Sequence, residues 1–189
     1  RPVMSGFGVL SLLPPVPLTP SKLPELLPSE ISVSTQASVE LRLYTNPGAS
    51  ASGSAKLTEL CQRSEPNLTL NLTTHRLIFT DETTNPITVV YVPHSAIYLK
   101  RSLTSDDVKN GSSIGTGNLD PKLTVEKRNA HFGRSPKIAF QMKPEFLAVE
   151  VVVKIDTASG NADRDEIFDK VCRALGRGGW EKVSVSLFE

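Results

Sequence analysis

The 189-residue sequence lacks most of the motifs that indicate an enzyme, a metal site or a membrane-spanning segment. It has two cysteines, Cys61 and Cys172, and no Cys-x-x-Cys pair, so neither a zinc knuckle nor a disulfide framework is predicted and a reduced protein is the simpler interpretation. No apolar run reaches the roughly 18–20 residues that cross a bilayer. The histidines His75, His94 and His131 fit no metal-binding spacing, and no Gly-x-Ser-x-Gly or phosphate-binding loop is present. We therefore expect no catalytic residue, no metal and no cofactor.

The chain also lacks an excess of charge and has few aromatic residues. Lys and Arg number 21 and Asp and Glu number 20, so the net charge is +1 and general binding to polyanions is excluded. One Trp, three Tyr and seven Phe are present, and they are not interleaved with the basic residues, which argues against a single-stranded nucleic-acid binder. A hydrolase whose triad assembles only in space is an alternative that no motif favours.

Proline is concentrated at the start. Seven of the 14 prolines lie in residues 1–28, where they disfavour regular helices and central strands. We expect residues 1–21 to form a proline-rich arm, partly packed through Leu10, Leu12 and Leu13. Residues 22–182 would then form one domain with a loop insertion at about 102–130, and residues 183–189 a tail.

Apolar residues alternate with polar ones over much of the remaining chain, which is typical of half-buried strands. Strands are predicted at residues 39–44, 68–73, 76–80, 88–92, 97–100, 137–141 and 147–155. The second and third of these are joined by so short a segment that they form a tight hairpin.

One helix is predicted near the end, at residues 162–175, where Ile167, Val171 and Leu175 recur at four-residue spacing. Asn161 or Asp163 would cap its start, and Gly176 would stop it. The order of many strands followed by one helix indicates a mainly β, α+β domain.

Charge is uneven along the chain. Residues 100–137 contain eight basic and four acidic residues, and from Lys127 to Lys143 there is no acid at all. Within this stretch the segment Gly133-Arg-Ser-Pro-Lys137 predicts a short turn before a strand, and such a turn offers N–H groups, a hydroxyl and two cations to a phosphate-sized anion. A solvated basic loop without a ligand is the alternative.

Several motifs resemble one family. The segment Leu68–Asp81, with its Thr-Thr-His-Arg-Leu-Ile core, the segment Val89–Leu99, the turn Gly133–Ile138 and the ending Gly179-Trp-Glu181 resemble the GLUE domain. This GRAM-like ubiquitin-binding module belongs to a subunit of the ESCRT-II complex. The resemblance extends, in short blocks, over about residues 22–182.

The resemblance implies a PH-like split barrel of two near-orthogonal antiparallel sheets with one C-terminal α-helix. It further implies an endosomal adaptor that is cytoplasmic, peripheral on the endosomal membrane, and binds phosphatidylinositol 3-phosphate or related phosphoinositides. Such an adaptor recruits ESCRT-II to ubiquitinated cargo for multivesicular body sorting. The other ESCRT-II subunits would bind through the rest of a longer chain.

The lipid site of the family uses basic residues at the matching turn, so Arg134 and Lys137 carry over. Lys100, Arg101 and Arg128 are added on the basis of charge and expected proximity. Arg76 matches the fold motif, and we interpret it as structural.

Ubiquitin is the second partner that the resemblance implies. Without the four cysteines of a zinc finger, the surface would be the exposed side of Asp165–Arg173 and the loop Thr80–Thr88, while Phe168 is expected in the core. The alternative function is a PH-like protein-interaction module that binds only ubiquitin and ignores lipid.

Overall fold

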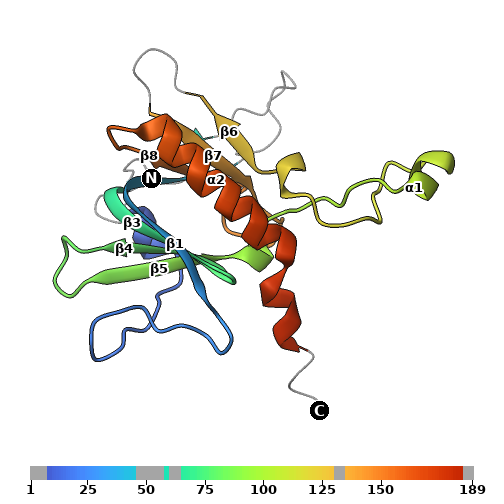
Figure 1. Ribbon diagram of the computed structural model, residues 1–189. Helices are drawn as coiled ribbons and strands as arrows, with labels where there is room; N and C mark the ends of the chain where they lie inside the picture. The colour runs from blue at the N-terminus through green and yellow to red at the C-terminus, as the bar shows by residue number, and fades with distance from the viewer. Residues whose placement is uncertain (1–7, 46–57, 60–64, 130–134, 185–189) are drawn as a thin grey trace, which may run out of the picture.

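The computed structural model describes residues 8–45, 58–59, 65–129 and 135–184 (Figure 1). The strands are β1 (Ser32–Thr45), β2 (Thr58–Glu59), β3 (Glu65–Thr73), β4 (Arg76–Asp81), β5 (Thr88–Pro93), β6 (Glu126–Arg128), β7 (Lys137–Gln141) and β8 (Glu150–Ile155). The α-helices are α1 (Ser105–Lys109) and α2 (Gly160–Arg177), and the short 3₁₀ helices are η1 (Val9–Leu12), η2 (His94–Ala96), η3 (Pro121–Leu123) and η4 (Gly179–Ser184). No helix among these is long and apolar enough to cross a membrane.

The strands form one antiparallel path in the order β5-β4-β3-β1-β8-β7-β6, with β2 paired to β1. The long strand β1 joins the two halves, because it pairs with β3 from Ser32 to Leu41 and with β8 from Val39 to Tyr44. Its register with β3 shifts between Gln36 and Val39, next to Ser38 with a φ of 56°. Such an irregularity bends a strand and increases its twist, so β1 turns from one half of the sheet into the other.

Helix α2 packs on the second half of the sheet and closes the core (Figure 1). Its apolar side buries Ile167, Val171 and Leu175, which are at most 2% exposed. These residues join Leu41 and Phe140 in one cluster with side chains from both halves of the sheet. The predicted four-residue apolar spacing is thus the side of the helix that faces the core, and Phe168, at 6% exposed, also lies there as expected.

The proline-rich arm is packed on the body. Val9, Leu10 and Leu13 are buried, whereas Leu12 is 40% exposed, so the expectation was wrong for Leu12. Further along, the N–H of Val16 donates to the carbonyl of Val89 at 2.8 Å, and Pro14 accepts the N–H of Tyr91 at 3.1 Å. Proline lacks the N–H that a central strand needs but can still accept hydrogen bonds, so this segment covers the outer edge of β5.

A buried ion pair fixes the segment just before β1 to the β3–β4 hairpin. The two carboxylate oxygens of Glu30 accept hydrogen bonds from Nε and Nη2 of Arg76 at 2.9 and 2.7 Å. The hydroxyl of Thr73 donates to the same carboxylate at 2.6 Å, and the Arg76 guanidinium lies 4.8 Å from the centroid of Tyr91. Arg76 therefore has a structural role, as we expected.

The predicted strand at residues 97–100 is wrong. The 3₁₀ helix η2 turns the chain at His94, and only Ile97 forms a bridge, to Met142. Residues 102–119, within the loop insertion predicted at about 102–130, then extend away from the body and contain the short helix α1 (Figure 1). A capping box between Thr104 and Asp107 begins α1 there, and backbone N–H groups of Thr104 and Thr116 lower the pKa of Asp107 to about 2.

Helix α2 begins and ends two residues outside the predicted range. Its N-cap is Ser159 rather than Asn161 or Asp163, and it ends at Gly178, whose φ of 59° favours glycine, rather than at Gly176. Trp180 follows in η4 and packs edge-on against buried His94, with ring centroids 5.2 Å apart.

Candidate basic-turn site

The turn before β7 lies against the start of α2. Pro136 accepts the N–H of Ile155 at 2.9 Å, and the Ser135 hydroxyl donates to Asp156 at 3.2 Å, so the turn is bound to the end of β8. A Cβ on Gly160, the first residue of α2, would lie 3.1 Å from the ring of Pro136. The helix N-terminus and the turn are therefore in direct contact, and Lys137 follows as the first, half-buried residue of β7.

The N-terminus of α2 has no side-chain cap. Ser159 makes no capping hydrogen bond, and the carboxylate of Asp163 instead accepts from the Thr157 hydroxyl. The first N–H groups of a helix carry its positive dipole end and bind anions when no side chain satisfies them. The start of α2 thus lies beside the end of the turn, where Asp156 accepts a hydrogen bond from the Ser135 hydroxyl.

Arg128 lies in the same cross-strand row as Lys137 and Lys154 on β6, β7 and β8. Its guanidinium reaches across β7 to both carboxylate oxygens of Glu150, at 2.7 and 3.0 Å, and to Glu126 at 3.4 Å. The hydrogen bonds that Arg128 donates to the Glu150 carboxylate raise the pKa of Arg128. The charge of Arg128 is thus already balanced within the sheet. A contact between Arg128 and a lipid head group stays a prediction.

Buried Arg164 positions the chain that leads into the turn. Its guanidinium donates to the carbonyl of Arg128 at 2.7 Å and to the side chain of Asn129 at 3.2 Å, and its Nε pairs with Asp165 at 2.8 Å. The first turns of α2 are therefore fixed to the end of β6. Arg134 itself lies outside the described residues.

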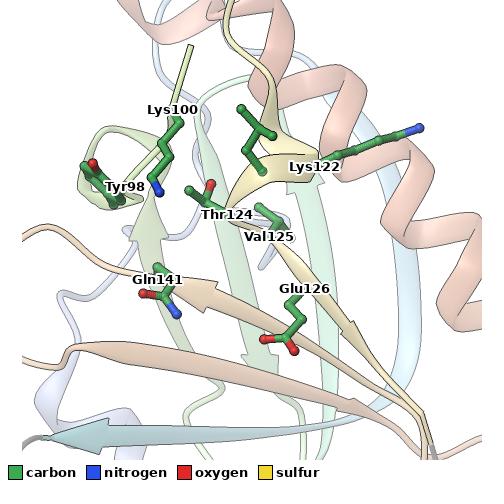
Figure 2. Close-up of a pocket in the computed structure, with 8 residues that line it drawn as sticks. Tyr98, Lys100, Lys122, Thr124, Val125, Glu126 and Gln141 are labelled. Carbon is green, nitrogen blue, oxygen red and sulfur yellow. The ribbon is translucent and has the colours of Figure 1, made fainter. Parts of the chain in front are cut away.

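Lys100 lies apart from the turn, in a cavity of about 330 Å³ at the other end of β7 (Figure 2). Figure 2 shows the Lys100 ammonium pointing into the space between Thr124 and Gln141, while Lys122 points away from it. Lys100 is exposed, and so is Arg101, whose Nη1 donates to the carbonyl of Gly117 at 3.3 Å at the root of the excursion.

Among the described residues, the structure does not gather the four predicted lipid-site residues Lys100, Arg101, Arg128 and Lys137 at one point. Lys137 and Gln141 are four residues apart on β7, which places the Lys100 cavity about 13 Å from the turn. Lys137 therefore lies apart from Lys100, while Arg128, which pairs with Lys137 in register, directs its guanidinium toward Glu126, a residue that lines the Lys100 cavity. That any of these residues contacts a ligand stays a prediction.

Of the two surfaces predicted to bind ubiquitin, the exposed side of α2 is charged, and the loop after β4 combines polar residues with exposed Pro86 and half-buried Ile87. On α2 the exposed residues between 165 and 173 are Asp165, Glu166, Asp169 and Arg173. In the loop after β4 the carboxylate of Asp81 is occupied by the N–H and hydroxyl of Thr83. A ubiquitin contact stays a prediction.

Comparison with known proteins identifies the fold. No protein-family model matches the sequence, and no curated protein matches it either. Among solved structures, the chain is similar to one described as the Vps36 N-terminal PH domain, with a TM-score of 0.51 and 16% sequence identity over 88% of this chain and 94% of that one. The chain has a PH-like fold. This confirms the predicted PH-like fold, and the similarity to the Vps36 N-terminal PH domain agrees with the predicted resemblance.

Sequence reasoning missed a second basic group on α2. Lys170, Arg173 and Arg177 line a cavity of about 380 Å³ together with Val33, Thr74, Ala174 and Gly179. The signal was the i, i+3, i+7 spacing of the three cations, which places them along one side of a helix. The missing cap at Ser159 could not be foreseen, because Asn161 and Asp163 are both good capping residues.

Proposed function

We propose that this domain is an adaptor that binds phosphoinositide head groups, with the 3-phosphate held at the basic turn. The observation that carries the proposal is the contact between the turn and the uncapped start of α2, on a PH-like scaffold. A fold match at this identity supports the scaffold alone, and the lipid assignment rests on the turn motif and its position.

Each part of the site has a distinct task in this proposal. Arg134 supplies a planar fork for two phosphate oxygens, and Lys137 a compact charge beside it. The first N–H groups of α2 donate along the helix axis, where the dipole favours an anion. Ser135 and Pro136 hold the end of the turn against β8 and α2, so that the helix N–H groups lie beside the turn before the ligand arrives.

Lys100 and Arg101 contribute as a second, weaker contact. Lys100 lines a cavity with Gln141, which lies about 13 Å from Lys137 along β7, so a single head group does not reach both ends of that strand. A negatively charged leaflet does reach both, because each basic residue near such a surface contributes about 1 kcal/mol. Binding is then weak and sensitive to salt, and useful affinity needs a second signal such as ubiquitinated cargo or the other ESCRT-II subunits. That setting places the protein in the cytoplasm, peripheral on the endosomal membrane.

Flotation with liposomes tests the proposal. Vesicles without phosphoinositide, with phosphatidylinositol 3-phosphate, and with more highly phosphorylated forms are compared for the native protein and for Arg134→Glu/Lys137→Glu. The double variant Lys109→Glu/Lys143→Glu changes the net charge equally at exposed positions outside the site. Selective flotation that only the first variant loses supports the proposal. Absent flotation, or equal loss in both variants, would leave a PH-like module that binds ubiquitin or another protein without lipid.

A further inference from the structure

The first half of β1 has an unpaired edge. β3 pairs with one edge of β1 from Ser32 onward, but β8 pairs with the other edge only from Val39. Past Ile155 the chain turns away, with Asp156 donating its N–H to Ser38. Within the described residues no strand pairs with the second edge of 32–37, and the side chains of this stretch are exposed or half-buried.

The cavity on α2 lies beside this half-strand. Val33 from β1 and Thr74 from the hairpin form one wall, and Lys170, Arg173 and Arg177 line the opposite wall with Ala174. Lys170 reaches from α2 to the Ser34 hydroxyl at 3.4 Å, which ties the two walls together. Figure 1 shows α2 and β1 next to each other over this part of the molecule.

The walls of the cavity combine apolar contact with unbalanced positive charge. Val33 is 42% exposed, and Ile31, immediately before β1, is 64% exposed. Lys170 has an acidic partner, Glu166, at 2.9 Å. Arg173 and Arg177 have no ion pair among the described residues, and both are exposed. Two guanidinium groups four residues apart on one helix side match carboxylates on an extended chain.

We propose that this groove binds an extended acidic peptide, which pairs with the open edge of β1 and places its carboxylates against Arg173 and Arg177. Strand addition satisfies the unpaired backbone groups of β1, and alternate side chains of the peptide face the groove. Apolar residues of the peptide cover Ile31 and Val33, and acidic ones meet the helix. The site lies at the C-terminal half of α2, whereas the basic turn lies at its N-terminus, so the inference does not depend on lipid binding.

The first test selects ligands without assuming their sequence. Random short peptides displayed on phage are selected on the 189-residue protein and depleted on the variant Arg173→Glu/Arg177→Glu. Enriched peptides should combine acidic and apolar residues and contain little proline, which cannot pair along a strand. Enrichment of neutral or basic sequences, or no enrichment, would overturn the proposal.

The second test separates strand pairing from simple charge attraction. An enriched peptide, labelled with fluorescein, is titrated by anisotropy, and Arg173→Glu/Arg177→Glu should weaken its binding by about tenfold or more. The matched variant Lys109→Glu/Lys143→Glu should stay within about twofold, since exposed charges away from a contact contribute little. Circular dichroism shows that both variants are folded. Equal weakening in the two variants contradicts a specific site.

Backbone methylation of the peptide provides the decisive comparison. Successive N–H groups of a strand point to opposite edges, so methylating one alternate set removes the hydrogen bonds to β1, and methylating the other set does not. One of the two methylated peptides should lose binding and the other retain it. Retention by both, or loss by both, would exclude pairing with the edge of β1.

Discussion

Neutralising Glu30 should lower the free energy of unfolding much more than neutralising an exposed glutamate. In the native fold the Glu30 carboxylate is fully buried and accepts hydrogen bonds from Arg76, Thr73 and the N–H of Leu27. Glu30→Gln leaves the Arg76 guanidinium, only 6% exposed, without its counter-charge. Removing one partner of a buried pair typically costs 3–5 kcal/mol, against a total stability of about 5–15 kcal/mol.

The magnitude is checked by urea unfolding, followed by circular dichroism. We expect a loss of about 3 kcal/mol for Glu30→Gln, because glutamine keeps part of the hydrogen bonding. The matched control is Glu166→Gln, which breaks the exposed pair with Lys170 and should cost at most about 1 kcal/mol. Adding Arg76→Met to Glu30→Gln should recover part of the loss, since no uncompensated charge is then buried.

Lowering the pH should destabilise the native protein in the same way as Glu30→Gln. Burial opposes ionisation of Glu30, but the hydrogen bonds from Arg76, Thr73 and Leu27 outweigh it and lower its pKa. The contribution of this group is therefore complete above its unfolded pKa of about 4.3 and is lost as the pH falls through the lower folded value. Equal unfolding free energies for Glu30→Gln and Glu166→Gln at pH 7 would refute the reasoning.

The remaining predictions concern buried His94 and the close contact at Gly115. Burial lowers the pKa of His94 to about 4, so the unfolded state binds more protons between that value and about 6.5, and the native protein should lose about 2 kcal/mol of stability between pH 7 and pH 5. The urea midpoint of His94→Phe should lack that part of the pH dependence, and a midpoint that varies with pH as in the native protein would contradict the prediction. A Cβ on Gly115 would lie 2.1 Å from the carbonyl oxygen of Arg101, whereas nothing lies within 4 Å of one on Gly111. Gly115→Ala should therefore speed hydrogen exchange over residues 102–119. Gly111→Asn should not, because asparagine tolerates the φ of 65° at that position. Equal exchange rates in the two variants would contradict a structural role for the contact at Gly115.

The sequence predicted those elements whose own pattern is decisive. Apolar patterns placed the second half of β1 and the strands β3, β4, β5, β7 and β8, and four-residue spacing placed α2, whereas residues 32–38 of β1 and the short β2 were not predicted. It missed β6, because Glu126, Lys127 and Arg128 have no apolar alternation and the strand exists only through pairing with β7. It misassigned residues 97–100, where β-branched and aromatic residues favour a strand but the chain leaves the sheet after a single bridge at Ile97.

The candidate site was harder to predict than the fold, because it depends on distances across strands. Charge along the chain grouped Lys100, Arg101, Arg128 and Lys137, yet the length of β7 separates them, and Glu150, far away in sequence, balances Arg128. The contact between Pro136 and Gly160 is likewise a product of tertiary packing. No local pattern indicates that the start of α2 meets the basic turn.

Flotation of Arg134→Glu/Lys137→Glu beside the native protein tests the central claim most directly. The account predicts that the native protein floats with vesicles containing phosphatidylinositol 3-phosphate, that added salt weakens this binding, and that the variant stays in the soluble fraction while Lys109→Glu/Lys143→Glu still floats. A folded Arg134→Glu/Lys137→Glu variant that floats as well as the native protein would contradict lipid binding at the basic turn.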